Sequence, residues 1–304
     1  MNDRCDLNLI KQKVAETVFE SAKHLTPQDI ENELANRCFY PKKQIKQAIK
    51  ALIAEQTLVY TYKYGHNFLE KSFNRPMRIS KRVVLKPPGI QYSGMPDDVV
   101  IEMQRGASFG IGDHPTTRLA VKGIEHILYT KRFLAGKKDT VALDIGTGSG
   151  ILAMTAVLFG VDKAIGTDID QIARKEAKEN IIINGLNNRI EVNDRPPDNI
   201  GGRFSLITAN LRYPTLASLY SRLNHITEDR AAVVISGLKT SEMSDIKELY
   251  TQTFLKLEKS EVEKGWGVMV FEKTAQGDIR TQKSGAAKVT TTCQSGVDPG
   301  CHLN

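Results

Sequence analysis

The sequence predicts an α/β protein in which a doubly wound, mostly parallel sheet follows a small α+β domain. Three observations predict this architecture. From about residue 109 to 273, apolar strand-like runs alternate with helical stretches, which is typical of a parallel sheet covered on both faces. Residues 1–85 hold fifteen Lys and Arg against nine Asp and Glu, so six of the seven net positive charges lie there. Residues 275–304 are polar and show no periodicity, which is typical of disorder.

Length and composition agree with two folded domains, because 304 residues are many for one compact unit and 40% of them are hydrophobic. No run approaches the length of a membrane span, and the charged start is unlike a signal peptide, so we expect a cytoplasmic protein with no membrane partner. The scattered Cys and His residues predict neither disulfides nor a metal site. The predicted divisions are a first domain at 1–75, a connector at 76–108, a sheet domain at 109–274 and a disordered tail at 275–304.

The first domain is predicted to contain three helices and a hairpin. Apolar spacing indicates a helix over 8–24, Thr26-Pro27 form the start of a second, and a third begins near Pro41. Two β-rich runs then flank Gly65-His66 as a hairpin. This order resembles a winged helix, whose third helix would be the recognition helix. The lysines on one face of that helix are Lys43, Lys46 and Lys50.

The basic first domain leaves its partner open. A nucleic acid such as rRNA, a docking protein, or only a solvated surface would each suit such a charge. The domain has no Arg or Asn cluster of the kind that reads bases, so sequence-specific DNA binding is not favoured.

The remaining elements follow in order along the chain. The connector carries two short strands, VVLKP and VVIEMQ, on either side of a hinge at Pro87-Pro88-Gly89. Strands are predicted at 141–145, 163–168, 189–194, 204–210, 231–237 and 266–273. Helices are predicted at 115–130, 150–159, 170–184, 214–225 and 240–250.

A glycine-rich loop follows the first strand of the sheet domain. The segment DIGTGSG holds Gly146, Gly148 and Gly150, which permit a sharp turn and a close ligand at the helix start. Asp168 ends the next strand, 22 residues after Gly146, and its carboxylate can accept both hydroxyls of a ribose. The pattern is not GxGxxG, and Asp144 would repel a diphosphate, so a cationic ligand is favoured over a nicotinamide dinucleotide.

The segment DIGTGSG resembles motif I of the class I S-adenosylmethionine-dependent methyltransferases. This resemblance implies a Rossmann-like methyltransferase with a seven-stranded sheet and S-adenosyl-L-methionine as cofactor. It also implies that the three glycines surround the amino-acid and ribose parts of the cofactor and that Asp144 orients the methionine ammonium. Asp168 would take the ribose hydroxyls and Asp194 would lie near the adenine amine, although Asn193 and Asp198 compete with Asp194 for that place.

A second segment, FGIGDHPTT, closely resembles the FGTGxHxTT stretch of the bacterial ribosomal protein L11 methyltransferases, which methylate lysine and N-terminal amines. The resemblance implies that this segment forms one wall of the cofactor pocket. The residues carried over are Phe109, Gly110, Gly112, His114, Thr116 and Thr117. The alternative for His114 is a structural cap, and for the two threonines a first helical turn that satisfies its own amides.

The fourth strand ends at Asn210, which we predict as the catalytic residue. Its side-chain carbonyl can accept a hydrogen bond from an amine and aim the nitrogen lone pair at the methyl carbon. The alternative is a cap of the following helix. Tyr213 offers an aromatic wall for a methylammonium product, or else packs in the core. Arg212 is unexpected beside a cationic amine and makes an acidic or phosphate-bearing substrate more plausible.

These features predict an S-adenosylmethionine-dependent N-methyltransferase of protein amines, with ribosomal protein L11 as a candidate substrate and no metal. The resemblance covers about 100–273 and does not reach the first domain, whereas L11 enzymes present their substrate with a ferredoxin-like N-terminal domain. One alternative is a nucleic-acid or small-molecule methyltransferase recruited by the winged helix. Another is a non-catalytic regulator that binds S-adenosylmethionine or DNA.

Overall fold

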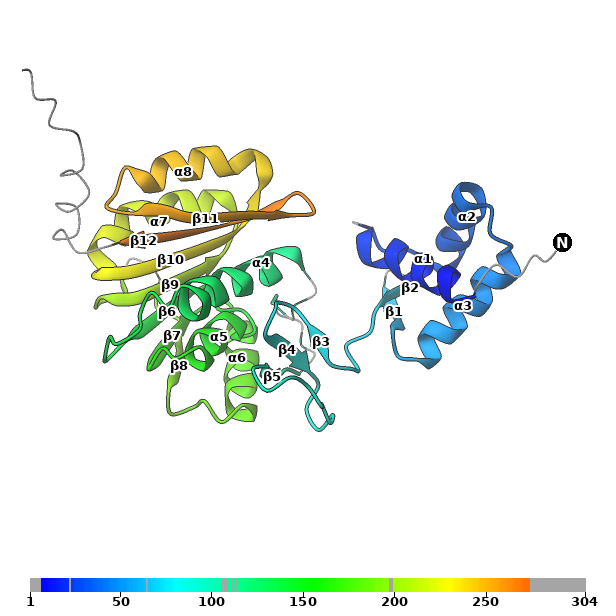
Figure 1. Ribbon diagram of the computed structural model, residues 1–304, viewed down its shortest axis with the longest axis horizontal. Coiled ribbons are helices and arrows are strands. Elements are labelled where there is room, and N and C mark those ends of the chain that lie inside the picture. The colour runs from blue at the N-terminus through cyan, green and yellow to red at the C-terminus, as the bar shows by residue number, and fades with distance from the viewer. Residues whose placement is uncertain are drawn as a thin grey trace, which may run out of the picture.

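The computed structural model describes residues 7–21, 23–63, 65–104, 106, 109–110, 112, 114–196 and 199–273 (Figure 1). Within these ranges, no helix has both the length and the apolar character needed to cross a membrane. The predicted tail at 275–304 lies outside the described residues.

The N-terminal unit has the three helices and the hairpin predicted for it. Its elements are α1 (Leu7–Glu20), α2 (Pro27–Cys38), α3 (Lys42–Ala54), β1 (Leu58–Lys63) and β2 (His66–Lys71). A capping box starts α2, because the Thr26 hydroxyl accepts from the Asp29 amide while the Asp29 carboxylate accepts from the Thr26 amide. A bridge from Leu25 to Leu69 ties the loop before α2 to the antiparallel hairpin. The unit has its own hydrophobic cluster, and its assignment as a winged helix stays a prediction.

The connector is a small sheet that packs against the larger domain. Its strands are β3 (Met77–Arg78), β4 (Val83–Lys86) and β5 (Val99–Glu102), in that order, with β4 and β5 parallel. The sequence predicted β4 and β5 and missed the two-residue β3. Val83, Leu85 and Ile101 belong to the same buried cluster as the helices of the sheet domain. The connector is therefore packed into the main body of the protein.

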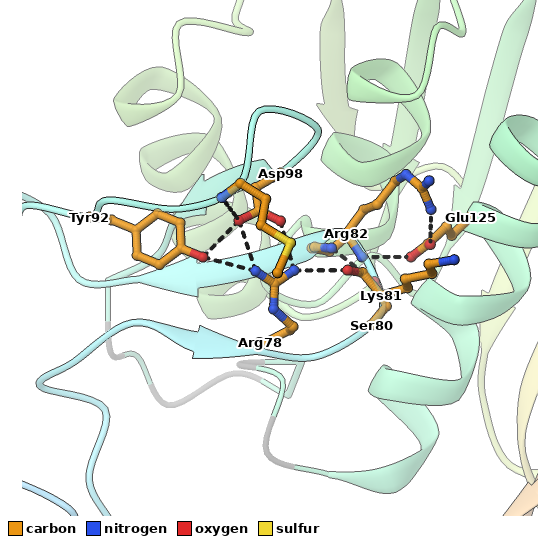
Figure 2. A network of polar contacts seen from close by, with 9 residues as sticks. Arg78, Ser80, Lys81, Arg82, Tyr92, Asp98 and Glu125 are labelled. Atoms are coloured by element: carbon orange, nitrogen blue, oxygen red, sulfur yellow. Dashed lines mark hydrogen bonds and ion pairs between the residues drawn. The ribbon is translucent and has the colours of Figure 1, made fainter.

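Charged side chains reinforce the connector, as Figure 2 shows. Arg78 donates to both carboxylate oxygens of Asp98, at 2.7 and 2.8 Å, and to the hydroxyl of Tyr92 at 3.0 Å. The hydrogen bonds from Arg78 hold the pKa of the Asp98 carboxyl well below its usual range. Arg82 then reaches Glu125 at 3.3 Å, which links the connector to the helical layer beside it.

The sheet domain is built on seven strands, as the resemblance implied. They are β6 (Val141–Ile145), β7 (Lys163–Thr167), β8 (Ile190–Asn193), β9 (Phe204–Asn210), β10 (Thr227–Lys239), β11 (Lys256–Glu263) and β12 (Trp266–Lys273). Their order is β11-β12-β10-β9-β6-β7-β8, and β12 is antiparallel to both of its neighbours. Six strands match the predicted runs. The seventh, β11, was missed because KLEKSEVE is a charged, half-exposed edge strand.

Helices cover both faces of this sheet (Figure 1). They are α4 (Pro115–Ile124), which continues as a π-helical turn (Glu125–Thr130), then α5 (Ile151–Leu158), α6 (Gln171–Ile183), α7 (Tyr213–Ile226) and α8 (Met243–Thr251). Alternate strand residues separate into two clusters: one packs with α4, α5 and α6 and the other with α7 and α8. The doubly wound, mostly parallel fold is thus confirmed, and the ends of β6, β7 and β9 meet at one edge.

Candidate functional site

The glycine loop adopts a backbone that only glycine accepts without strain. Gly146, Gly148 and Gly150 have φ values of +71°, +54° and +83°. A Cβ on Gly148 would lie 2.6 Å from the carbonyl oxygen of Phe109, and a Cβ on Gly150 would lie 3.4 Å from the Cβ of Ala177. The loop glycines therefore permit both the turn and its close approach to Phe109 and Ala177.

The loop is hydrogen-bonded to the wall segment that the resemblance predicted. The Ser149 amide donates to the Phe109 carbonyl at 3.1 Å, and the Ser149 hydroxyl donates to the Gly110 carbonyl at 2.9 Å. On the other side of that segment, a Cβ on Gly112 would lie 2.3 Å from the Leu85 side chain. The two sequence motifs thus form one structural site, which rests against the connector.

Asp144 lies beneath the loop and is fully buried. Its two oxygens accept hydrogen bonds from the hydroxyls of Thr147 and Thr208, each at 2.7 Å. Burial raises the pKa of this carboxyl to about 6, the hydroxyls act against that rise, and the charge of Asp168 adds to it. In this structure Asp144 therefore fastens the loop to β9, a contact that the ammonium-orienting role implied by the resemblance did not include.

Asp168 lies at the end of β7, as predicted, and is half-buried. One carboxylate oxygen accepts from the Gly148 amide and the other from the Asp170 amide, both at 2.9 Å. Asp194 is different, because its side chain is 74% exposed and lies 4.0 Å from the guanidinium of Arg174. Arg174 also donates to the backbone carbonyl of Asp168, so its side chain contacts both residues. Asp198 lies outside the described residues.

The wall segment ends in a capped helix. His114 is the N-cap of α4, and its Nδ1 accepts from the Thr116 amide at 3.3 Å, which agrees with a structural role. Thr117 is fully buried, and its hydroxyl oxygen has no hydrogen-bond partner in the described part of the chain. A buried hydroxyl oxygen without a partner is a candidate hydrogen-bonding group for a ligand.

An aromatic cluster adjoins the cap. The His114 ring lies 5.2 Å from the ring of Phe109, which is 53% exposed, and 5.1 Å from that of Trp266. No sequence motif predicted the place of Trp266 beside His114, although it is the chain's single tryptophan and begins the last strand.

Asn210 is the last residue of β9, and its side-chain oxygen is buried without a partner among the described residues. It does not cap α7, whose N-cap is Arg212. The next residue, Leu211, covers the glycine loop, since a Cβ on Gly146 would lie 2.5 Å from its side chain. Tyr213 packs against the core cluster on the α7 side, and Arg212 is exposed.

No group of three or more His, Cys, Asp or Glu side chains that could hold a metal ion occurs within the ranges that the structure describes.

The strand order together with the glycine loop after β6 defines the Rossmann-like methyltransferase fold. Within it, the chain belongs to the ribosomal protein L11 methyltransferase (PrmA) family of S-adenosylmethionine-dependent enzymes, whose family model matches residues 12–274. The match is longer than the resemblance seen in the sequence, which was limited to about 100–273. It therefore includes most of the N-terminal unit.

Relatives agree with this assignment. The ribosomal protein L11 methyltransferase of Geobacter metallireducens is 35% identical over 197 residues, which are 65% of this chain and 62% of that protein. The one from Geobacter sulfurreducens is 35% identical over 196 residues, 64% of this chain and 62% of its own. A crystal structure of ribosomal protein L11 methylase from Lactobacillus delbrueckii subsp. bulgaricus has a TM-score of 0.57 and 25% identity, and it covers 67% of this chain and 100% of its own. This chain thus spans about three fifths of the length of the curated relatives it matches.

Proposed function

We propose that this chain transfers a methyl group from S-adenosylmethionine to a nitrogen atom of a protein, with ribosomal protein L11 as the first acceptor to test. Family membership supports the reaction class and the acceptor. The proposal rests mainly on Asn210. Among the described residues its side-chain amide oxygen is buried without a hydrogen-bond partner, at the edge where β6, β7 and β9 end. An acceptor oxygen there suits a nitrogen nucleophile, which has an N–H to donate.

The residues around the loop fit S-adenosylmethionine. Each carboxylate oxygen of Asp168 accepts one backbone amide and keeps capacity for a ribose hydroxyl. The buried Asp144 supplies negative charge beneath the loop, which favours a cation over a phosphate. The unpaired hydroxyl of Thr117 offers a further hydrogen bond to the ligand.

The mechanism follows from what these side chains hold in place. Bound S-adenosylmethionine supplies an electrophilic methyl group on a sulfonium centre. Asn210 Oδ1 holds an N–H of the neutral amine, so that the nitrogen lone pair points along the line of displacement. The rings of Phe109, His114 and Trp266 form an aromatic cluster at the start of α4, and such a cluster would stabilise a methylated ammonium by cation–π attraction.

The basic face of α3 makes rRNA the second acceptor to test rather than the first. Lys46 on α3 pairs with Glu31 at 3.5 Å, so part of the basic face is neutralised within the unit. Lys43 and Lys50 remain exposed on the same helix. Such lysines supply a salt-sensitive attraction for rRNA but no base-reading set, which keeps rRNA as the second partner to test.

Transfer of tritiated methyl groups from S-adenosylmethionine to purified L11 and, in parallel, to purified rRNA tests the proposal. The Asn210→Ala variant should lose about 100-fold in turnover, since a misplaced nucleophile costs that much, while the Kd for S-adenosylmethionine stays within about twofold of wild type. Asn188→Ala, which removes an exposed amide in the loop before β8, is the matched control and should keep full turnover. Wild-type turnover in Asn210→Ala would remove Asn210 from the mechanism. Label found in rRNA rather than in L11 would overturn the protein acceptor.

A further inference from the structure

Helix α6 carries an asparagine that touches both the cofactor loop and the chain leading to the wall segment. Asn180 is 2% exposed. Its amide nitrogen donates to the Ser149 carbonyl at 3.0 Å, and its amide oxygen accepts from the Gln104 backbone amide at 3.0 Å. Ser149 is the same residue whose amide and hydroxyl hold Phe109 and Gly110. One side chain therefore joins Ser149, which bonds to the wall segment, to Gln104, which lies five residues before that segment begins at Phe109.

One helical turn further on, Asn184 makes a second set of hydrogen bonds, and none of those described involves the glycine loop. Its amide nitrogen donates to the Glu102 carbonyl at 2.7 Å, and its oxygen accepts from the Glu102 amide at 2.9 Å. Since β5 is the edge strand of the connector sheet, this amide takes the place of a neighbouring strand. Asn184 thus anchors the connector, whereas Asn180 anchors the connector and the loop together.

We infer that Asn180 is a positioning residue for S-adenosylmethionine: it fixes the loop at Ser149 in register with the wall that begins at Phe109. The inference rests on the proposed function, because it concerns the pocket for that cofactor. Without the Asn180 amide, the Ser149 carbonyl and the Gln104 amide lose their buried partner. Ser149 then keeps only its own bonds to Phe109 and Gly110, and Gln104 loses its bond to α6. The end of the loop at Ser149 can therefore move away from α6, which widens the pocket.

The chain offers a matched pair of variants to test this. Asn180→Leu, within α6, and Asn184→Leu, at its C-cap, each replace a side-chain amide by an apolar side chain that makes no hydrogen bond. Asn184 loses at least as many hydrogen bonds as Asn180, so a general loss of stability should affect it at least as strongly. Binding of S-adenosylmethionine and of S-adenosylhomocysteine is measured by isothermal titration, which needs no acceptor. The thermal midpoint of each unliganded protein is measured alongside.

The expected result is a split between affinity and stability. Asn180→Leu should raise the Kd for both ligands about tenfold, which is 1.4 kcal/mol, and Asn184→Leu should leave them within about twofold despite an equal or larger fall in Tm. Amide hydrogen exchange at Gly146–Gly150 should become faster in unliganded Asn180→Leu and stay unchanged in Asn184→Leu. Equal losses of affinity in both variants, or unchanged loop exchange in Asn180→Leu, would overturn the inference and leave the proposed function standing. A folded wild-type protein that binds neither ligand would overturn both.

Discussion

The buried carboxyl of Asp144 predicts an unusual dependence of stability on pH. Its ordinary pKa of 3.8 applies to the unfolded chain, and burial raises the pKa to about 6 in the folded protein. Between these two values the folded state holds a proton that the unfolded state has lost, so this carboxyl destabilises the fold progressively as pH rises. The pKa shift corresponds to about 3 kcal/mol in the free energy of unfolding, which is lost as the pH rises from about 4 to about 7.

The Asp144→Asn variant isolates this effect. An amide at 144 can still accept from one threonine hydroxyl and donate to the other, so Thr147 and Thr208 keep their partners. Urea unfolding from pH 4 to pH 7.5, followed by circular dichroism and by the fluorescence of Trp266, gives the free energy of unfolding of both proteins. Relative to the variant, the wild type should lose about 3 kcal/mol across that range. A difference that stays constant with pH would refute a raised pKa for Asp144.

The same carboxyl links pH to the cofactor. A cationic ligand stabilises the ionised form, so S-adenosylmethionine should bind more weakly as the pH falls below about 6 and should release a proton on binding near that pH. Titrations in buffers of different ionisation enthalpy measure the proton release. Asp144→Asn should show neither effect, and equal proton release by both proteins would assign it to another group.

Two further substitutions test the loop and the core. Gly148→Ala places a Cβ 2.6 Å from the Phe109 carbonyl oxygen and should weaken S-adenosylmethionine binding more than tenfold. The control is Gly136→Ala, also at a positive φ but in open space, which should leave the affinity unchanged. Equal affinities of the two variants in a titration would contradict the close contact at Gly148. Tyr250→Phe removes a buried hydrogen bond of 2.9 Å to the Leu216 carbonyl and should lower the free energy of unfolding by about 1 kcal/mol. Tyr62→Phe, at an exposed ring, should leave that free energy unchanged. An unchanged free energy of urea unfolding in Tyr250→Phe would show that this hydrogen bond makes no net contribution to stability.

Much of the fold could be predicted because its strands are apolar and its turns carry glycine. The predicted run at 141–145 coincides with β6, since a central parallel strand is buried on both faces and appears in sequence as a continuous apolar stretch. The positive φ values of Gly146, Gly148 and Gly150 likewise follow from residue type. The edge strand β11 had no such signal, because its partner β12 covers only one side of a charged sequence.

The sequence predicted the position of a site residue where its own place in a strand or motif determines that position. It could not predict a contact that depends on residues far apart in the sequence. Asn210 follows directly after an apolar strand, so its place at the sheet edge could be predicted. Asn180 gave no signal, because a polar residue within a helix is ordinary and its partners, Gln104 and Ser149, are 76 and 31 positions away. Asp144 lies between these cases: its position in the motif was clear, but its enclosure by two hydroxyls depends on Thr208, 64 positions away.

These long-range contacts share one physical cause. The carboxyl ends of β6, β7 and β9 expose backbone groups that no strand covers, and a pocket at this edge must leave some of them free for a ligand. Side chains satisfy the rest: Asp168 takes the Gly148 amide and Asn180 takes the Ser149 carbonyl. Such partners come from whichever element lies nearest in space, so they can be found only once the fold is known. A sequence motif therefore predicts the residues that would contact the cofactor, and the tertiary structure identifies those that hold them in place.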